Sequence, residues 1–363
     1  MGASCDSKGK KNTIISAGEI GTKDKSYVIS VMQVLYNIPN FKKYFTQNEF
    51  KENPNKHLSI LFKKIVSTPL KNVEFEKEAN EILQILRNKY GLNTGYTPGD
   101  ILIQILLVLK YEEKQIQTKN WEEYAFNTPN IYNNLSNSMQ AFNDILNFNQ
   151  EHYNTTFSAM FFGIFYAKRK LQKIQNILYI YNFFCVYELN MPMIYQNMIS
   201  KGKIMNNGNQ LAQIGLIDCI KELQETQKEL FKNENSLVEY YIFHPPTFLI
   251  FLLKSDTPNL DTFRGIITFQ EYMNFSQVIQ NSNSFNFKLI SVINKDRYKS
   301  KEKQNKGGVW MSNPDDDKRP YYKAIFRGEQ DKFYYCDKNS VKNCELNIND
   351  IEYYHYILIF MKN

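Results

Sequence analysis

Cysteine is scarce in this sequence, and no two cysteines form a Cys-x-x-Cys pair. The 363-residue chain contains five, namely Cys5, Cys185, Cys219, Cys336 and Cys344. An odd number of widely spaced cysteines in a chain of this size argues against a disulfide framework and favours a reducing compartment. Because tetrahedral zinc needs four converging ligands, we expect no metal and no other cofactor, and we interpret the cysteines as buried apolar residues.

Long hydrophobic runs are also absent. The longest, residues 159–167, is far shorter than the ~20 residues that a membrane-spanning helix needs, and no apolar run follows the first lysines as a secretory signal would require. Gly2 fits the start of a myristoylation signal, but Asp6 stands where that signal needs serine or threonine. We therefore expect residues 1–13 to be a flexible basic tail without an acyl group, and the protein to be intracellular, either cytoplasmic or nuclear.

Neither sign of charge forms a long run. Lysine and arginine number 44, aspartate and glutamate number 37, and the two signs are interleaved around a net charge of +7. Interleaved charge is typical of a solvated surface, so we expect no nucleic-acid partner. Hydrophobic residues make up 43% of the chain, with 25 Tyr and 26 Phe but only 2 Trp, which is ample for a large core.

The first half of the chain has the apolar spacing of helices. Residues 27–35 place apolar side chains on one face, and Pro39 should end this helix because proline disfavours helix at the residue before it. Residues 74–90 form a second amphipathic stretch. Asp100 is placed to cap a third helix over residues 101–109, which is apolar on nearly all sides and should be buried.

The second half has the aromatic and β-branched runs of strands. One helix is expected among them, over residues 213–231, and the charged residues 295–319 around Gly307-Gly308 should form a long surface loop. Helices first and strands later indicate an α+β fold rather than alternating α/β. The expected strands cover residues 179–189, 247–253, 287–293, 321–327, 332–336 and 353–360.

Five segments of the chain resemble, in the same order, segments of the ubiquitin-specific protease (USP) family. Residues 18–45 are similar to the family's cysteine box, Gly-Leu-x-Asn-Leu-Gly-Asn-Thr-Cys-Tyr followed by an Asn-Ser-x-Leu-Gln helix. Residues 97–100 and the leucine-rich run after them are similar to the Gln-Gln-Asp-Ala-x-Glu-Phe-Leu segment. The residues that match the cysteine box are Gly18, Tyr27, Ser30, Gln33, Val34 and Leu35.

The other three segments lie in the second half. Residues 216–220 resemble the family's leucine-x-Asp-Cys-Leu helix start, and residues 246–254 resemble its Pro-x-x-Leu-x-x-x-Leu-Lys strand. Residues 287–294 and 321–360 resemble the histidine box and the C-terminal strands. The resemblance implies a papain-like USP fold as a single domain over residues 14–363, with a helical thumb at about residues 14–160 and β-rich fingers and palm at about residues 161–363.

The resemblance also assigns the positions of a cysteine protease. Such an enzyme needs a nucleophile, a base, a group that orients the base and an oxyanion donor. These positions fall on Ser26, Tyr321, Asp337 and Gly21 respectively, so only the orienting acid is retained. Glycine has no side-chain donor, and tyrosine, with a pKa of about 10, is a poor base.

None of the four histidines is near the base position in the sequence. They are His57, His152, His244 and His355. A catalytic base must reach its nucleophile through a hydrogen bond, so we expect each to have a structural or surface role. The two Cys-x-x-Cys pairs of the family's zinc ribbon are also missing.

We therefore predict no enzymatic activity, but a catalytically inactive USP-like protein, a pseudo-deubiquitinase, that acts as a scaffold or interaction module in a larger assembly. Two alternatives stay open. One is an active or weakly active thiol ubiquitin hydrolase, although Cys5, the only cysteine near the box, lies 21 residues before Ser26. The other is a receptor that holds ubiquitin without cleaving it, against which Lys23, Lys25 and Tyr321 add bulk at the end of the tail channel.

The expected loop at residues 295–319 is the candidate interface with a protein partner. It has basic residues at its start and three aspartates near its end, and between them lie Val309, Trp310 and Met311. Aromatic and methionine side chains are enriched at interface centres, so we expect these three residues to contact the partner. The alternative is that Trp310 folds back and plugs the cleft, because large aromatic residues are usually buried in their own chain.

The missing cysteine pairs yield the first testable prediction. Elemental analysis of protein dialysed against a chelator should find far less than one zinc per chain, because no close pairs of ligands are available to build a tetrahedral site. A USP with an intact zinc ribbon is the positive control. One equivalent of zinc that survives the chelator would contradict the prediction.

Overall fold

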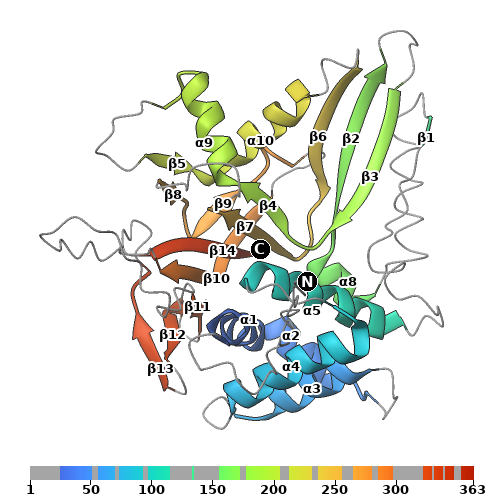
Figure 1. The fold of residues 1–363 in the computed structure, drawn as a ribbon, viewed down its shortest axis with the longest axis vertical. Coiled ribbons are helices and arrows are strands. Elements are labelled where there is room, and N and C mark those ends of the chain that lie inside the picture. Colours follow the sequence, from blue (N-terminus) through green and yellow to red (C-terminus); the bar gives the residue numbers. More distant parts are fainter. Residues whose placement is uncertain are drawn as a thin grey trace, which may run out of the picture.

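The computed structural model describes residues 25–50, 56–69, 73–92, 97–114, 133–134, 155–171, 177–204, 212–230, 236–255, 265–279, 285–296, 322–328, 331–337, 340–346 and 353–363. Within these ranges, helices gather in the first half of the chain and strands dominate the second, as the sequence predicts. In Figure 1 the first helices lie below a large sheet, and a smaller sheet rises beside α10. No helix in the described ranges is both long and apolar enough to cross a membrane.

The helical half has six helices in the described ranges, and the apolar spacing predicts three of them. Its members are α1 (Ser26–Tyr36), α2 (Pro39–Gln47), α3 (His57–Ser67), α4 (Phe75–Tyr90), α5 (Pro98–Lys114) and α8 (Thr156–Phe161). The predictions for α1 and α4 are confirmed. The first helix ends before Pro39, and α4 ends at Gly91, whose φ of 65° is the left-handed conformation that favours glycine.

The predicted cap of α5 is wrong by three residues. The helix starts at Pro98, and the Thr97 hydroxyl accepts a hydrogen bond from the Asp100 backbone N–H at 3.2 Å while donating to the Asp100 carboxylate at 2.7 Å. Thr97 is therefore the capping residue. Asp100 lies in the first turn, where the helix dipole favours a negative charge.

The large sheet is almost entirely antiparallel, with the strand order β13-β12-β11-β10-β14-β7-β4 and with β9 also paired to β10. Only β4 and β7 pair in parallel within it. Most of these strands lie where the sequence predicts them. They are β4 (Tyr187–Asn190), β7 (Phe248–Lys254), β9 (Tyr272–Asn274), β10 (Asn286–Asp296), β11 (Tyr322–Arg327), β12 (Phe333–Asp337), β13 (Ser340–Cys344) and β14 (Tyr353–Lys362).

Two smaller sheets and two helices complete the described part of the chain. A four-stranded sheet has the order β1-β3-β2-β6, and β5 pairs with β8. These strands are β1 (Asn133–Asn134), β2 (Gly163–Leu171), β3 (Ile177–Phe184), β5 (Gln213–Gly215), β6 (Ser236–His244) and β8 (Ile266–Thr268). The helices are α9 (Met191–Ser200) and α10 (Leu216–Leu230).

The structure corrects two predicted elements here. Residues 179–189, expected to be one strand, belong to β3 and β4 in different sheets, because the chain turns at Cys185 and Val186 without glycine or proline to mark the break. The helix expected over residues 213–231 loses its first three residues to β5. Both errors follow from apolar runs whose periodicity does not reveal where one element ends.

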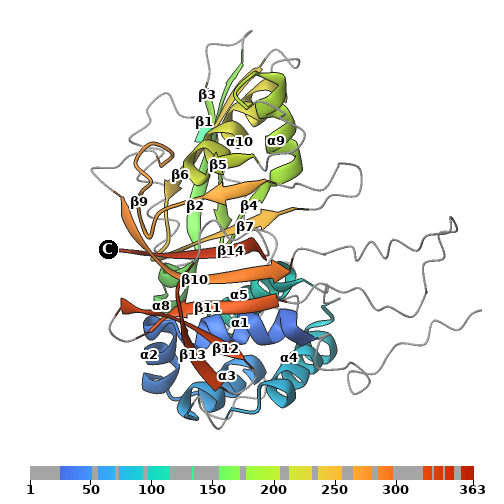
Figure 2. The same cartoon turned by 90° about the vertical axis from the view of Figure 1, so that its left-hand side faces the viewer.

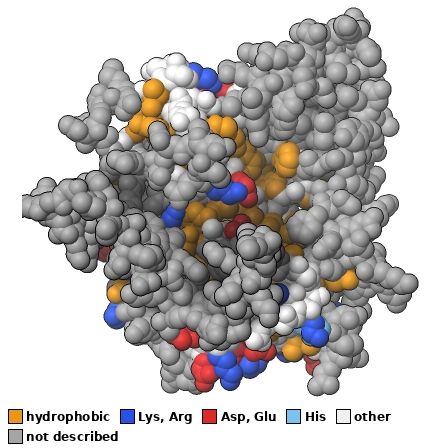
Figure 3. All heavy atoms as spheres, in the orientation of Figure 1, with side chains coloured by type: hydrophobic (Ala, Val, Ile, Leu, Met, Phe, Trp, Pro, Cys, Tyr) orange, Lys and Arg blue, Asp and Glu red, His pale blue; other side chains and the backbone are white. Residues whose placement is uncertain are grey.

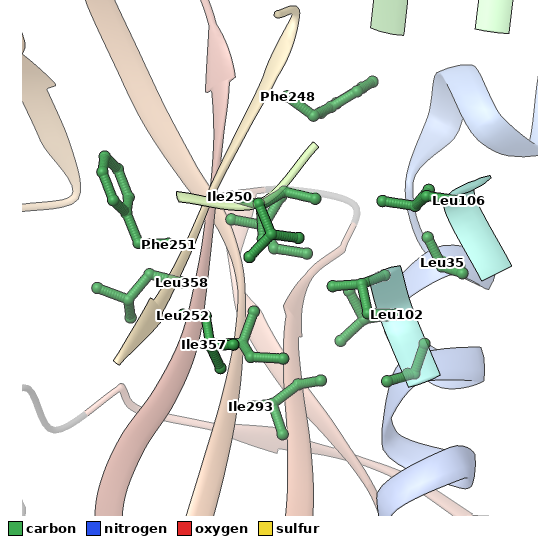
Figure 4. Close-up of a cluster of buried hydrophobic side chains, with 14 of the residues drawn as sticks. Leu35, Leu102, Leu106, Phe248, Ile250, Phe251, Leu252, Ile293, Ile357 and Leu358 are labelled. Atoms are coloured by element: carbon green, nitrogen blue, oxygen red, sulfur yellow. The ribbon is translucent and has the colours of Figure 1, made fainter. Parts of the chain in front are cut away.

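One face of the large sheet packs against α1 and α5. Figure 4 shows Leu35, Leu102 and Leu106 on these helices facing Ile250, Leu252, Ile293 and Ile357 on the strands, while Phe251 and Leu358 point to the opposite side of the sheet. All nine side chains are at most 2% exposed. The sheet is thus covered on both faces, which explains why β7 is an unbroken apolar run rather than an alternating one.

Buried Glu112 on α5 ties three helices of this half together. Its two carboxylate oxygens accept hydrogen bonds from the first free backbone N–H groups of α3, Leu58 at 2.9 Å and Ser59 at 2.7 Å, and from the hydroxyl of Tyr90 at the end of α4. Burial raises the pKa of Glu112, and these hydrogen bonds offset part of that effect.

The outer surface carries charged side chains. Figure 3 shows side chains of both charges mixed along its lower edge.

The Glu112 contacts yield a stability prediction. Replacing Glu112 by alanine should lower the free energy of unfolding by about 3 kcal/mol, because two helix N–H groups and the Tyr90 hydroxyl lose their acceptor in a buried place. Urea denaturation measures the change. The control is Glu74→Ala at the start of α4, where the side chain is 71% exposed and the change should stay within about 0.5 kcal/mol. Equal effects of the two substitutions would contradict the assignment.

Candidate functional site

The first residue of α1 meets the first residue of β11. The Ser26 hydroxyl oxygen accepts a hydrogen bond from the backbone N–H of Tyr322 at 3.2 Å, across 296 positions of the sequence. Ser26 is 5% exposed and Tyr322 is 4% exposed. The hydroxyl is therefore buried and joins the helical half to the large sheet.

Strand β12 brings Asp337 to the same end of the sheet. Strands β11 and β12 are antiparallel with Ile325 opposite Tyr335, so Asp337, two residues further along β12, lies toward the start of β11. Its backbone pairs with that of Ser340, the first residue of β13. The side chain of Asp337 lies outside the description. Sequence segments assigned to the nucleophile and the orienting acid thus converge at one end of β11.

The remaining predicted site residues lie outside the described ranges. These are Gly21, Tyr321, Val309, Trp310 and Met311, and also Lys23. Lys25 is described and is only 6% exposed, directly before Ser26. The prediction that Lys23, Lys25 and Tyr321 narrow a tail channel stays a prediction.

Comparison of the fold with solved structures gives a consistent match. A chain of the SAGA Ubp8/Sgf11/Sus1/Sgf73 DUB module aligns with a TM-score of 0.59 at 14% identity, covering 95% of this chain and 67% of that one. The chain has a USP-like fold. A chain of the yeast SAGA DUB module with a mutant Sgf73 gives a TM-score of 0.54 at 13% identity, over 95% and 65% of the two chains.

The DUB module has also been solved bound to ubiquitin aldehyde. That structure aligns with a TM-score of 0.50 at 14% identity, covering 95% of this chain and 69% of that one. No family model matches the sequence. No curated protein matches it either. At these identities the similarity establishes the fold alone.

Within this USP-like fold, the described thiols are unsuited to nucleophilic attack. Cys185 and Cys219 are 7% and 0% exposed, which confirms their interpretation as buried residues. Burial raises the pKa of Cys185 to about 12 and raises that of Cys219 as well, so both remain protonated at neutral pH. Burial also raises the pKa of the half-buried Cys344. A nucleophilic cysteine needs the opposite shift, toward the thiolate.

Neither histidine whose side chain is described forms a hydrogen bond with Ser26. His57 is the first residue of α3 and His244 is the last residue of β6. In the described part of the chain, the recorded partner of the Ser26 hydroxyl is the Tyr322 backbone. The side chains of His152 and His355 lie outside the description. No three histidine, cysteine or acidic side chains among the described residues are grouped so as to hold a metal ion.

Two lysines contact the ring of Tyr335 near the start of β11. The ammonium group of Lys323 lies 3.8 Å from the centre of the Tyr335 ring, and that of Lys342 on β13 lies 5.9 Å from it. Sequence reasoning missed both this pair and the Ser26 hydrogen bond, because cross-strand neighbours and backbone partners carry no local signal.

The Ser26 contact yields a prediction that separates a structural hydroxyl from a catalytic one. Ser26→Ala should lower the free energy of unfolding by about 1.5 kcal/mol, since the buried N–H of Tyr322 loses an acceptor. Ser30 on the same helix is the matched control, because its buried hydroxyl bonds only to the nearby Tyr27 carbonyl at 3.2 Å. Ser30→Ala should change stability by less than about 0.5 kcal/mol. A Ser26→Ala protein as stable as the wild type would show that the hydroxyl does not join the two halves.

Proposed function

We propose that this chain is a catalytically inactive USP-like protein, a pseudo-deubiquitinase that serves as an interaction module in a larger assembly. The observation that carries the proposal is the buried Ser26 hydroxyl, which is hydrogen-bonded to the backbone of β11. In the alignment with the USP cysteine box, this is the position of the nucleophile. The hydroxyl at this position has a structural role, because it accepts a hydrogen bond from the backbone of β11.

Three chemical arguments support inactivity. A serine nucleophile needs a general base to take its proton, and the base position holds Tyr321; tyrosine as a residue type, with an unperturbed pKa of about 10, is a poor base. An oxyanion needs a donor, often among the larger contributions to catalysis, and Gly21 has no side chain to supply one. The described cysteines remain as protonated thiols, which argues against an active thiol hydrolase with its nucleophile elsewhere.

An interaction role is supported by what the chain retains. The core between the proposed thumb, residues 14–160, and the proposed palm and fingers, residues 161–363, is intact around Leu102 and Leu252. A structure that loses its chemistry while keeping such packing still presents a defined surface. The solved neighbours are components of a module that combines several proteins, which is consistent with a role in an assembly.

A non-cleaving ubiquitin receptor is the second candidate. Its support is the neighbouring DUB module solved with ubiquitin aldehyde bound. The bulk of buried Lys25 beside Ser26 weighs against it, because an extra side chain in a packed channel clashes with a peptide tail.

The residues Val309, Trp310 and Met311 remain the predicted contacts with a protein partner. Deleting residues 299–316 would test them. If these residues plug the cleft, the deletion should lower the melting temperature and leave the partners unchanged. If they form the interface, the deletion should abolish binding of the partner.

The activity prediction is direct. Purified protein should neither cleave a fluorogenic ubiquitin substrate above a heat-inactivated control nor react with a ubiquitin-based covalent probe, because thiolate and base are both missing. Non-covalent binding of ubiquitin, measured on the same sample by calorimetry, distinguishes the receptor from the scaffold. Turnover that disappears in Ser26→Ala or Cys5→Ala would disprove inactivity and locate the nucleophile.

A restoration experiment tests the reason for inactivity. The double variant Ser26→Cys, Tyr321→His should still show little turnover, because Gly21 cannot donate to the oxyanion. Adding Gly21→Asn should then raise the rate by about 10²–10³-fold if the alignment is correct, which is the contribution of one such donor. Full activity in the double variant alone would show that the missing donor is not limiting.

A further inference from the structure

Tyr272 is an exposed aromatic residue at the end of β11 opposite to Ser26. It begins β9, which pairs with the first residues of β10, and Figure 2 shows β9 beside the larger strands of the sheet. Its side chain is 53% exposed, more than that of any other large hydrophobic residue in the described ranges. Since β11 spans five residue steps from Tyr322 to Arg327, the two places are roughly 17 Å apart.

The Tyr272 ring is held in place from beneath. Its hydroxyl donates a hydrogen bond to the Asp331 carboxylate at 3.3 Å, and the Lys288 ammonium lies 5.4 Å from the ring centre. Lys288 also forms an ion pair with Asp331. A rigid, exposed aromatic side chain loses little conformational entropy on binding, which is the property of an interface anchor.

Arg327 fixes the rest of this surface. Its guanidinium donates to the Leu289 carbonyl at 2.9 Å and to the Glu271 carboxylate at 2.6 Å, and it lies over the Phe333 ring at 4.4 Å. It also donates to the Asp331 carbonyl at 3.1 Å. Arg327 therefore binds both Glu271, next to Tyr272 in the sequence, and Asp331, whose carboxylate accepts a hydrogen bond from the Tyr272 hydroxyl.

The two signs of charge are arranged in layers. The side chains of Arg327 and Lys288 are 6% and 20% exposed, whereas those of Glu271 and Asp331 are 45% and 50% exposed. Hydrogen bonds from Lys288 and Arg327 lower the pKa of Asp331, so it stays ionised at neutral pH. Solvent therefore meets an aromatic ring and two carboxylates, on a chain whose net charge is +7.

We propose that the Tyr272 surface, formed by Tyr272, Glu271 and Asp331, docks a basic segment of a protein partner. An arginine or lysine of the partner would lie on the open face of the Tyr272 ring, within reach of the two carboxylates. Exposed carboxylates repel phosphate, which argues against a nucleic acid or an anionic membrane as the occupant. The inference deepens the interaction role proposed above and rests on it, but its test does not involve ubiquitin.

The test uses a rhodamine-labelled arginine-rich decapeptide as the probe and its glutamate-rich counterpart as the control. Fluorescence anisotropy should detect salt-sensitive binding of the basic peptide, even though the chain as a whole is basic. Tyr272→Ala should weaken this binding about three- to fivefold through loss of the cation–π contact. Tyr272→Phe, which keeps the ring, and Glu74→Gln, which removes an exposed carboxylate at the start of α4, should each change it by less than about twofold.

Four outcomes would overturn the proposal. Three are an absence of binding, unchanged affinity in Tyr272→Ala, and tighter binding of the acidic peptide. A fourth is a shift of the protein alone from dimer to monomer in Tyr272→Ala, seen by analytical ultracentrifugation, which would assign the surface to a second copy of the chain. Thermal melting of each variant verifies that it is folded. The ubiquitin assays measure a separate property, so failure of either proposal leaves the other result readable.

Discussion

The packing of α1 and α5 against the large sheet is the contact on which the rest of the molecule depends. Leu35, Leu102 and Leu106 face the strands across it (Figure 4). The approach is so close that a Cβ on Gly99 would lie 2.6 Å from a methyl carbon of Leu252, so any other residue there would force the Leu252 side chain to shift. Because this seam joins distant parts of the sequence, it also sets where Ser26 meets β11.

The sequence was most informative where an element has one clear period. The apolar face of α1, its end before Pro39 and the amphipathic α4 could be read directly. The division of residues 177–190 into two strands in different sheets could not, because apolar and aromatic residues continue through Cys185 and Val186 and no glycine or proline separates the strands. The cap of α5 was misplaced because Thr97 and Asp100 both have capping side chains, and only their mutual hydrogen bonds identify the cap.

For the candidate site, two of the positions that the resemblance selected, Ser26 and Asp337, lie near one end of β11, but the resemblance did not reveal what the chemical groups do there. A hydroxyl at residue 26 is compatible with a weak nucleophile, a cap or a structural hydrogen bond. Its partner is a backbone N–H, and a backbone group leaves no trace in residue identity. Sequence reasoning also missed the arrangement of charges around Tyr272. Glu271, Lys288 and Arg327 are separated in sequence, and only the strand register brings them together.

Glu112 connects α3, α4 and α5 through one carboxylate, and this has a consequence for how the molecule opens. Local unfolding of any one of these helices would strip a buried charge of part of its hydrogen bonding, so the cost is shared by all three. The helices should consequently exchange their most protected amide protons with similar rates, as one cooperative unit. The Glu112 carboxylate, which caps the start of α3, thereby determines the smallest segment that can unfold independently, namely α3, α4 and α5 together.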